Sequence, residues 1–282
     1  MKILTINAPA KINLGLQVLN KRADGFHSIN SLMTRVPVFD KINLESADKL
    51  VFACDTDLGI PNEKNIAYLA AKKLMNKLNI SEGIKITLKK VIPAGGGLGG
   101  GSSDAAAVMK GICSYFKIPD SDELNKILYD IACSLGSDVP FFLQNGSAIA
   151  TGRGEILQYF DFTLPWSVQI VAPNFGISTG TAYQNLNRSN KEYYTIDYSK
   201  YIKFLKSHPV LLKQVFRNDF IYPEMEHASE FQFILDKMYE AGALFASMSG
   251  SGSCCFGLYE NPNSIDKTEK YFGNYKTFVG KL

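Results

Sequence analysis

The chain has 282 residues, of which 46% are hydrophobic, so it can bury a large core and form one or two domains. Its formal net charge of +3 is spread without a basic block, which excludes a surface that follows nucleic-acid phosphates. No apolar run approaches the roughly 20 residues of a membrane span, and five cysteines without a Cys-x-x-Cys pair fit a reducing compartment, so we expect a cytoplasmic protein.

The first predicted element is a strand over residues 9–19, where apolar and polar residues alternate. One face carries Ile12, Leu14, Leu16 and Val18, and the other carries Lys11, Asn13, Gly15 and Gln17. The polar residues of the second face could either point into solvent or form part of a functional site. The small Gly15 among them indicates that another group approaches this face closely. Asp24-Gly25 predicts a hairpin turn, and Phe26 and His27 follow it, where they could hold a planar ring or simply pack.

A glycine-rich loop is the strongest signal in the chain. Residues 93–104 read Pro-Ala-Gly-Gly-Gly-Leu-Gly-Gly-Gly-Ser-Ser-Asp, after a strand predicted over 84–88 and before helical apolar spacing over 105–116. Bare N–H groups in such a loop can face an anion. Ser102-Ser103-Asp104 is expected to cap the helix, whose N-terminus also favours negative charge. The pattern therefore predicts a phosphate site, and a flexible linker is disfavoured because both flanks are amphipathic.

Two known phosphate loops fit this segment less well. A P-loop needs a lysine after its glycines, and residues 91–109 contain none. The spacing Gly-x-Gly-x-x-Gly begins at Gly95, as in a dinucleotide-binding unit. Asp120, however, opens a helix predicted over 124–135, where a Rossmann unit would end its second strand.

A further candidate for chemistry follows that helix. Gly136 is placed to end it, and Asp138 stands two residues before Pro140. Asp138 is either the cap of a short helix or a catalytic carboxylate.

The second half of the chain predicts a strand over 168–172, a binding or connecting loop over 173–183 and a helix around 231–238. Two apolar stretches follow, joined by Ser249-Gly250-Ser251-Gly252, which is either a hairpin turn or a second glycine loop that closes over the first. Residues 187–208 carry no recognisable motif.

Taken in order, the segments 9–14, 95–104 and 248–253 resemble the three motifs of the GHMP kinases. Segments 22–27 and 135–142 resemble, more narrowly, the branch that phosphorylates the 2-hydroxyl of a methylerythritol linked to cytidine diphosphate in non-mevalonate isoprenoid biosynthesis. Two alternatives stay open: a GHMP kinase for another small alcohol such as homoserine or mevalonate, and a nucleotide-binding sensor without turnover. The presence of Lys11 and Asp138 disfavours the sensor.

The resemblance implies an α+β fold of two domains, at residues 1–155 and 156–282. The first would be a β/α domain with a left-handed crossover, the second would resemble the ferredoxin-like layout, and the active site would lie in the cleft between them. ATP and Mg²⁺ are the implied cofactors, and the enzyme is expected to be a monomer or a weak homodimer.

The resemblance also implies roles for individual residues. Lys11 and Asp138 would be the catalytic pair. The ATP-binding residues would be Pro93, Ala94, Gly95, Gly96, Gly97, Leu98, Gly99, Gly100, Gly101, Ser102 and Ser103, with Ser103 the candidate metal ligand. The substrate contacts would be Asn13, Phe26, His27, Thr179, Tyr183, Gly250 and Gly252. His27 would read the edge of a cytosine stacked between Tyr183 and Phe26, where the family usually has tyrosine.

Overall fold

The computed structural model describes residues 3–188 and 193–282. The chain forms two compact units, each made of several segments. Unit 1 takes residues up to 10, 38–94 and 99–145, and unit 2 takes residues 11–37, 95–98 and 146–282. The division follows packing rather than chain order. The predicted boundary between residues 155 and 156 therefore stays a prediction, as do the handedness of the crossover and the cleft.

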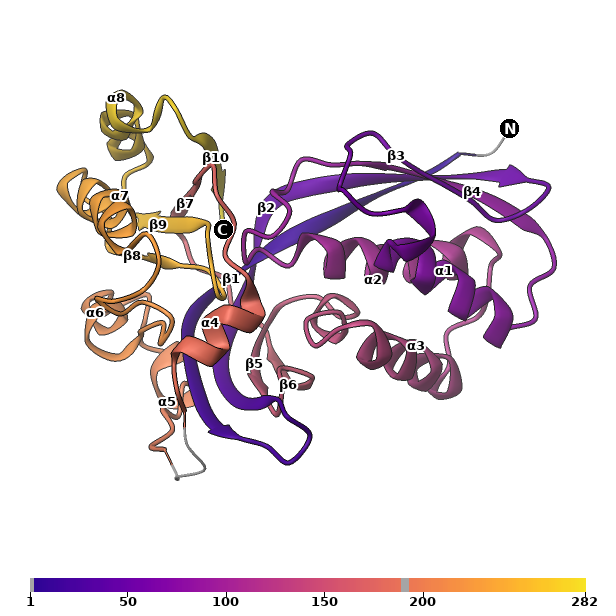
Figure 1. The fold of residues 1–282 in the computed structure, drawn as a ribbon, viewed down its shortest axis with the longest axis horizontal. Coiled ribbons are helices and arrows are strands. Elements are labelled where there is room, and N and C mark those ends of the chain that lie inside the picture. The colour runs from indigo at the N-terminus through magenta and orange to yellow at the C-terminus, as the bar shows by residue number, and fades with distance from the viewer. Residues whose placement is uncertain (1–2, 189–192) are drawn as a thin grey trace. The chain divides into compact units, whose positions relative to one another are not determined.

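Unit 1 is a sheet covered by helices. Its strands are the start of β1 (Leu4–Lys21), the end of β2 (His27–Ala47), β3 (Val51–Cys54) and β4 (Gly83–Lys89). β4 pairs antiparallel with β2 and parallel with β3. The helices are η1 (Asn62–Lys64), α1 (Ile66–Lys77), α2 (Gly100–Tyr115), α3 (Asp122–Leu135) and η2 (Pro140–Phe142). The three α-helices pack on one another beside one face of the sheet (Figure 1).

The sequence predicts two of these elements well and misplaces one boundary. β4 and α3 lie where expected, and Ser121 caps α3 by accepting a hydrogen bond from the Leu124 N–H. The predicted cap of α2 at 102–104 is wrong, because the helix begins at Gly100 and its N-cap is Gly99. Gly99 has φ 69° and ψ 18°, a left-handed conformation that glycine adopts without strain, so the loop ends there without a side-chain cap.

Unit 2 contains two sheet regions. In the first, the start of β2 pairs with β5 (Ser147–Thr151), which pairs with β6 (Ile156–Phe160). The second is an antiparallel sheet in the order β10-β7-β9-β8. Its strands are β7 (Ser167–Ala172), β8 (Phe245–Met248), β9 (Cys255–Tyr259) and β10 (Lys276–Lys281). Helices α4 (Thr179–Asn185), α5 (Ser199–Ile202), α6 (Val210–Val215) and α7 (Ala228–Glu240) precede β8, and η3 (Pro262–Thr268) and α8 (Glu269–Phe272) precede β10.

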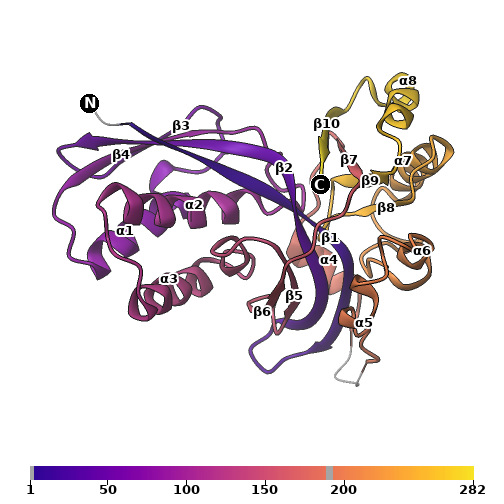
Figure 2. The same ribbon diagram turned by 180° about the vertical axis from the view of Figure 1, so that it is seen from behind.

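The antiparallel sheet confirms the predicted ferredoxin-like layout. Its strands and helices follow the order β-α-β-β-α-β, and the first and third strands of this series are the central pair. α7 lies beside β8 and β9 (Figure 2) and buries Phe231, Ile234, Leu235 and Met238. This apolar stripe matches the spacing that predicted the helix.

The polar face of β1 is buried, so of the two alternatives left open the solvated face is wrong. Lys11, Asn13 and Gln17 are only 3%, 3% and 1% exposed. Gln17 and Asn30 hold the segment around residue 196: the Ile196 N–H donates to Gln17 Oε1 at 2.8 Å, and Asn30 Nδ2 donates to Ile196 O at 2.8 Å. That segment belongs to the stretch without a recognisable motif, of which residues 189–192 lie outside the described residues.

The group that approaches Gly15 is Tyr198. A Cβ at position 15 would lie 2.6 Å from the Tyr198 hydroxyl oxygen, closer than real Cβ contacts come. Tyr198 is 1% exposed and stacks on Phe216 at 5.2 Å between ring centroids. The glycine in β1 is therefore required by a buried tyrosine ring.

Candidate functional site

The first part of the glycine loop, residues 95–98, is held by its carbonyl groups. Gly96 O accepts from Cys254 N at 3.1 Å, Gly97 O from Lys11 Nζ at 2.8 Å and Ser249 Oγ at 2.9 Å, and Leu98 O from Lys11 N at 2.9 Å. A trans peptide directs its C=O and the following N–H to opposite sides. The N–H groups that follow these carbonyls therefore turn away from the protein partners, as an anion-binding loop requires.

Glycine is required at position 97 by a backbone contact. Gly97 has φ 74°, and a Cβ there would lie 2.0 Å from the carbonyl oxygen of Ser249. Gly95 has a similar φ of 69°, but a Cβ there would meet nothing within 4 Å. The two glycines thus share a backbone conformation and differ in crowding.

The segment Ser249–Ser253 is both a hairpin turn and a second glycine loop packed on the first. It joins β8 to β9, and Asn218 holds it by donating from Nδ2 to Met248 O at 2.7 Å and to Gly250 O at 2.8 Å. Gly250 and Gly252 have φ values of 58° and 95°. Thr179, at the start of α4, is within hydrogen-bonding distance of Ser251, at 2.9 Å between the hydroxyl oxygens.

Lys11 connects β1 to the glycine loop. Its buried ammonium donates to Asn13 Oδ1 at 2.6 Å as well as to Gly97 O. Asn13 Nδ2 donates to Ser31 Oγ at 2.7 Å, and Ser31 Oγ donates to Gly15 O at 2.7 Å. A buried cation must be hydrogen-bonded, and the predicted neighbours Lys11 and Asn13 satisfy this requirement together.

In unit 1, the start of α2 is fixed by a buried set of charges, here called the Lys90 cluster (Asp40, Lys90 and Asp104). Lys90 Nζ donates to Asp40 Oδ2 at 2.5 Å and to Asp104 Oδ2 at 2.9 Å. Asp40 Oδ1 accepts the N–H groups of Val91 and Ile92, at 2.6 and 2.9 Å. Sequence reasoning missed Asp40 and Lys90, because they lie 50 residues apart and belong to no motif.

The Lys90 cluster sets one ammonium against two carboxylates. Burial raises the pKa of Asp104 to about 8; Lys90 opposes this shift, and Asp40 adds to it. Burial by itself lowers the pKa of Lys90, but Asp104 and Asp40 together outweigh it, so that pKa is raised. The lysine therefore stays charged, and Asp104 holds a proton at neutral pH.

Two buried oxygens at the start of α2 have no hydrogen-bond partner among the described residues. They are Ser103 Oγ and Asp104 Oδ1. The two side chains follow the glycine loop directly and are 1% and 2% exposed. Buried hydroxyls without a hydrogen-bond partner are uncommon in folded proteins.

Asp138 lies in the turn between α3 and η2 and is half-buried. The N-cap of η2 is Val139, without a side-chain cap, so the capping explanation for Asp138 is wrong. The turn packs near the start of α2, because a Cβ on Gly136 would lie 4.0 Å from Ser102 Oγ. Asp138 belongs to unit 1, whereas Lys11 belongs to unit 2.

The predicted cytosine contacts Phe26, His27 and Tyr183 all lie in unit 2. His27 stacks on Tyr183, with centroids 5.3 Å apart and 16° between the planes. Phe26 is 52% exposed, and the Arg153 guanidinium lies 4.9 Å from its ring centroid. Burial lowers the pKa of His27, and the charges of Lys21 and Arg188 lower it further, so the imidazole is neutral at pH 7.

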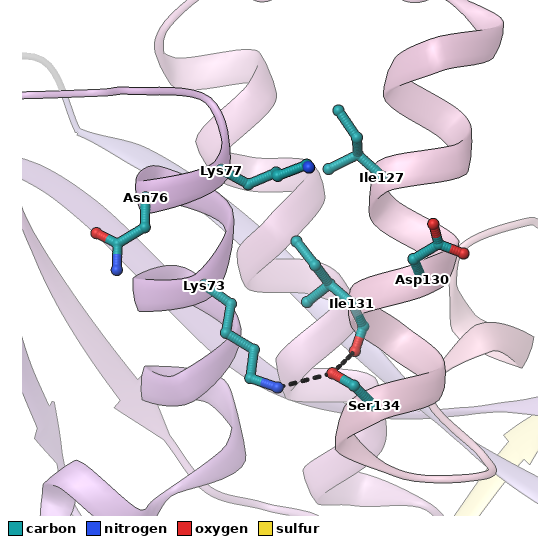
Figure 3. A pocket seen from close by; sticks show the side chains of 7 residues that line it. All are labelled: Lys73, Asn76, Lys77, Ile127, Asp130, Ile131 and Ser134. Atoms are coloured by element: carbon teal, nitrogen blue, oxygen red, sulfur yellow. Dashed lines mark hydrogen bonds between the residues drawn. The ribbon is translucent and has the colours of Figure 1, made fainter.

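A groove between α1 and α3 contains none of the predicted site residues. Its lining is Lys73, Asn76, Lys77, Ile127, Asp130, Ile131 and Ser134 (Figure 3). Lys73 Nζ donates to Ser134 Oγ at 2.8 Å across it. Among the described residues, no group of three or more His, Cys, Asp or Glu side chains could hold a metal ion, and no helix is long and apolar enough to cross a membrane.

Comparison with known proteins matches two stretches of the chain to one family. The profile of the GHMP kinases N-terminal domain matches residues 65–146, and that of the C-terminal domain matches residues 220–275. The 4-diphosphocytidyl-2-C-methyl-D-erythritol kinase of Chlorobaculum parvum is 34% identical and covers 99% of this chain and 97% of its own. The kinase of the same name from Thermodesulfovibrio yellowstonii is 37% identical and covers 97% and 95%.

Solved structures show the same fold. A crystal structure of 4-(cytidine 5'-diphospho)-2C-methyl-D-erythritol kinase has a TM-score of 0.81 and 29% identity and covers 99% of both chains. Homoserine kinase from Cytophaga hutchinsonii has a TM-score of 0.70 and 19% identity and covers 99% of this chain and 94% of its own. The predicted α+β GHMP kinase fold is thus confirmed.

We predict that Gly97→Ala lowers the melting temperature more than Gly95→Ala does. Both variants force alanine into a left-handed conformation, but only the first drives a methyl group into the Ser249 carbonyl. The extra crowding should cost about 1–3 kcal/mol, or several degrees in melting temperature. Calorimetry on the two variants measures this difference, and equal melting temperatures would contradict the contact.

We also predict that Asp104→Asn changes how stability depends on pH. The folded-state pKa of Asp104 is raised, so the folded state binds the extra proton between about pH 4 and 8. This group therefore makes the free energy of unfolding fall as pH rises through that window, by at most about 1.4 kcal/mol per pH unit.

Denaturant unfolding at several pH values between 4.5 and 8 tests this prediction. The Asn variant should lose less stability with rising pH than the unsubstituted protein. Asp130→Asn is the control, because Asp130 is 59% exposed and pairs with Lys126 on the surface. Parallel pH profiles for the Asp104→Asn and unsubstituted proteins would rule the buried proton out.

Proposed function

The chain belongs to the 4-diphosphocytidyl-2-C-methyl-D-erythritol kinase family of the GHMP kinases, and we propose that it transfers the terminal phosphoryl group of ATP to the 2-hydroxyl of that substrate. The observation that carries the proposal is the identity of 34% and 37% to kinases of this name over nearly the full length of the chain. The contacts at the glycine loop, at Lys11 and around His27 support it.

The ATP phosphates would lie against the N–H side of residues 95–98 and the N-terminus of α2. Left-handed glycines let the backbone approach an anion closely, and the partial positive charge of a helix N-terminus adds to the attraction. α2 suits this role because it has 16 residues and begins directly after the loop.

Mg²⁺ fits the start of α2 through one protein ligand. The unpartnered hydroxyl of Ser103 is a hard oxygen donor, and Mg²⁺ commonly keeps waters and phosphate oxygens as its other ligands. When bound, the ion would neutralise charge on the phosphates.

Phosphoryl transfer depends mainly on positioning and on stabilising charge. Asp138 would accept the proton of the attacking hydroxyl late in the transfer, because a free carboxylate is too weak a base to ionise an alcohol beforehand. Lys11, held by Asn13 and Gly97, would stabilise the charge that develops on the oxygen. Lys11 and Asp138 belong to different units. The proposed transfer requires that both side chains reach the hydroxyl of the substrate.

The cytosine would be held by Tyr183, Phe26 and His27. A neutral imidazole carries one donor and one acceptor nitrogen, as reading a base edge requires. His27 now covers one face of Tyr183, so the proposal requires the imidazole to turn from that face toward the edge of the base. Phe26 has an exposed ring available for stacking, without the hydroxyl that a tyrosine would add. Thr179, Gly250 and Gly252 would complete the substrate side.

A coupled assay of ADP release tests the substrate. We expect turnover with 4-diphosphocytidyl-2-C-methyl-D-erythritol and at most a trace with homoserine or mevalonate. Turnover with one of the latter two would assign another small alcohol, and nucleotide binding without turnover on any of the three would assign a sensor.

We predict that Lys11→Ala and Asp138→Asn each lower kcat by about 10²–10⁴-fold, because a positioned proton acceptor and its charged neighbour act on the transfer step. Asp138→Asn should keep the affinity for ATP, whereas Lys11→Ala also removes a hydrogen bond to the glycine loop at Gly97 O and should weaken ATP binding as well. Steady-state kinetics and nucleotide titration measure both. Lys73→Ala and Asp130→Asn are matched controls from the α1–α3 groove and should retain kcat within twofold. A kcat within threefold of the unsubstituted enzyme for either site variant refutes its role.

A further inference from the structure

Ser31 lies on β2 with its side chain fully buried between two groups of β1. It is 0% exposed, accepts a hydrogen bond from Asn13 Nδ2 at 2.7 Å and donates one to the carbonyl oxygen of Gly15 at 2.7 Å. No sequence motif includes it, and it does not contact the glycine loop through a hydrogen bond that the described residues show. Its contact with Asn13 nevertheless brings it one step from Lys11.

The hydrogen bonds of Ser31 determine which way the Asn13 amide faces. Lys11 has only donors at its ammonium, so it needs the oxygen of that amide. The Ser31 hydrogen is engaged by Gly15 O, which leaves the hydroxyl lone pairs to accept from the amide nitrogen. Turning the amide by 180° would place its nitrogen against the ammonium and its oxygen against an oxygen without a free hydrogen.

The orientation of Asn13 in turn places the Lys11 ammonium. Nζ lies 2.6 Å from Asn13 Oδ1 and 2.8 Å from Gly97 O, so two acceptors on different segments fix its position. Loss of the first acceptor would remove one of the hydrogen bonds that place this buried cation. A displacement of about 1 Å at a catalytic group can lower a rate by about 100-fold.

We propose that Ser31 is a positioning residue for phosphoryl transfer, acting on Lys11 through the amide of Asn13. This inference rests on the proposed function, since it assumes that Lys11 acts on the substrate hydroxyl. Ser31 touches neither nucleotide nor substrate in this role. It affects the rate of phosphoryl transfer, and it leaves the affinity for ATP unchanged.

The experiment is a double-mutant cycle on the full-length enzyme, with kcat and KM measured for ATP and 4-diphosphocytidyl-2-C-methyl-D-erythritol. The variants are Ser31→Ala, Asn13→Ala and the two combined. We expect Ser31→Ala to lower kcat by about 10- to 100-fold with KM for ATP unchanged. In the Asn13→Ala background the same change should lower kcat by less than about twofold, because residues that act through one another are not additive.

Ser147→Ala is the matched control for a merely structural effect. Ser147 is a 1% exposed serine on β5 whose hydroxyl donates to Phe162 O at 3.1 Å and shares a hydrogen bond with Thr34 Oγ1 at 2.9 Å. Its removal also deletes two buried hydrogen bonds in unit 2, to Thr34 and Phe162 rather than to Asn13 or Lys11. It should lower the melting temperature about as much as Ser31→Ala and leave kcat within twofold.

Ser31→Cys covers the case in which Ser31→Ala does not fold. The thiol keeps the shape of the side chain but hydrogen-bonds weakly, so kcat should fall while the fold is retained. An unchanged kcat in the folded Ser31 variants, or an effect that adds in full to that of Asn13→Ala, overturns the inference alone. A normal kcat for Asn13→Ala overturns the role of Asn13 in the proposed function and the inference with it.

Discussion

The hydrogen bonding of the buried Lys11 ammonium is the interaction on which the glycine loop at residues 95–98 depends. An ammonium removed from water costs several kcal/mol unless it is hydrogen-bonded, and this one is 3% exposed. Two of its acceptors, Asn13 Oδ1 and Gly97 O, come from β1 and from the glycine loop. Each acceptor is held by a further contact, Asn13 by Ser31 and Gly97 by Ser249. The loop is therefore shaped by the need to satisfy one charge.

The start of α2 meets a similar requirement in unit 1. Lys90 satisfies two buried carboxylates, and one of them anchors the backbone that leads into the glycine segment through Val91 and Ile92. Burial raises the pKa of Asp104 far above its usual value, and repulsion from Asp40 adds to the shift, so a proton on Asp104 relieves both. A helix whose first turn is tied in this way can present its N–H groups without a side-chain cap.

Local patterns in the sequence predict the helices and strands, but they do not predict which distant residues pack against them. Alternation over residues 9–19 places β1 and its two faces correctly, but period-two spacing contains no information on whether a polar face meets water or Tyr198. The glycine density predicts the phosphate loop, yet the reason for glycine at position 97 is a carbonyl 152 residues away. Hydroxyl-rich residues at 102–104 predicted a cap, and the left-handed Gly99 took that place instead.

The choice of the alcohol that is phosphorylated would depend on a part of unit 2 that differs chemically from the glycine loop and Lys11. The glycine loop and its lysine are satisfied by backbone carbonyls and an amide, groups that contain no information on which alcohol is phosphorylated. Residues 26 and 27 and Tyr183 instead offer rings, with an imidazole that burial and two nearby cations keep neutral. A protonated imidazole would present two donors, whereas cytosine offers both an acceptor and a donor along its edge, so lowering this pKa favours base recognition at neutral pH. On the proposed function, selectivity would rest on a few exposed or half-buried rings, and the buried polar contacts would position the groups that carry out the transfer.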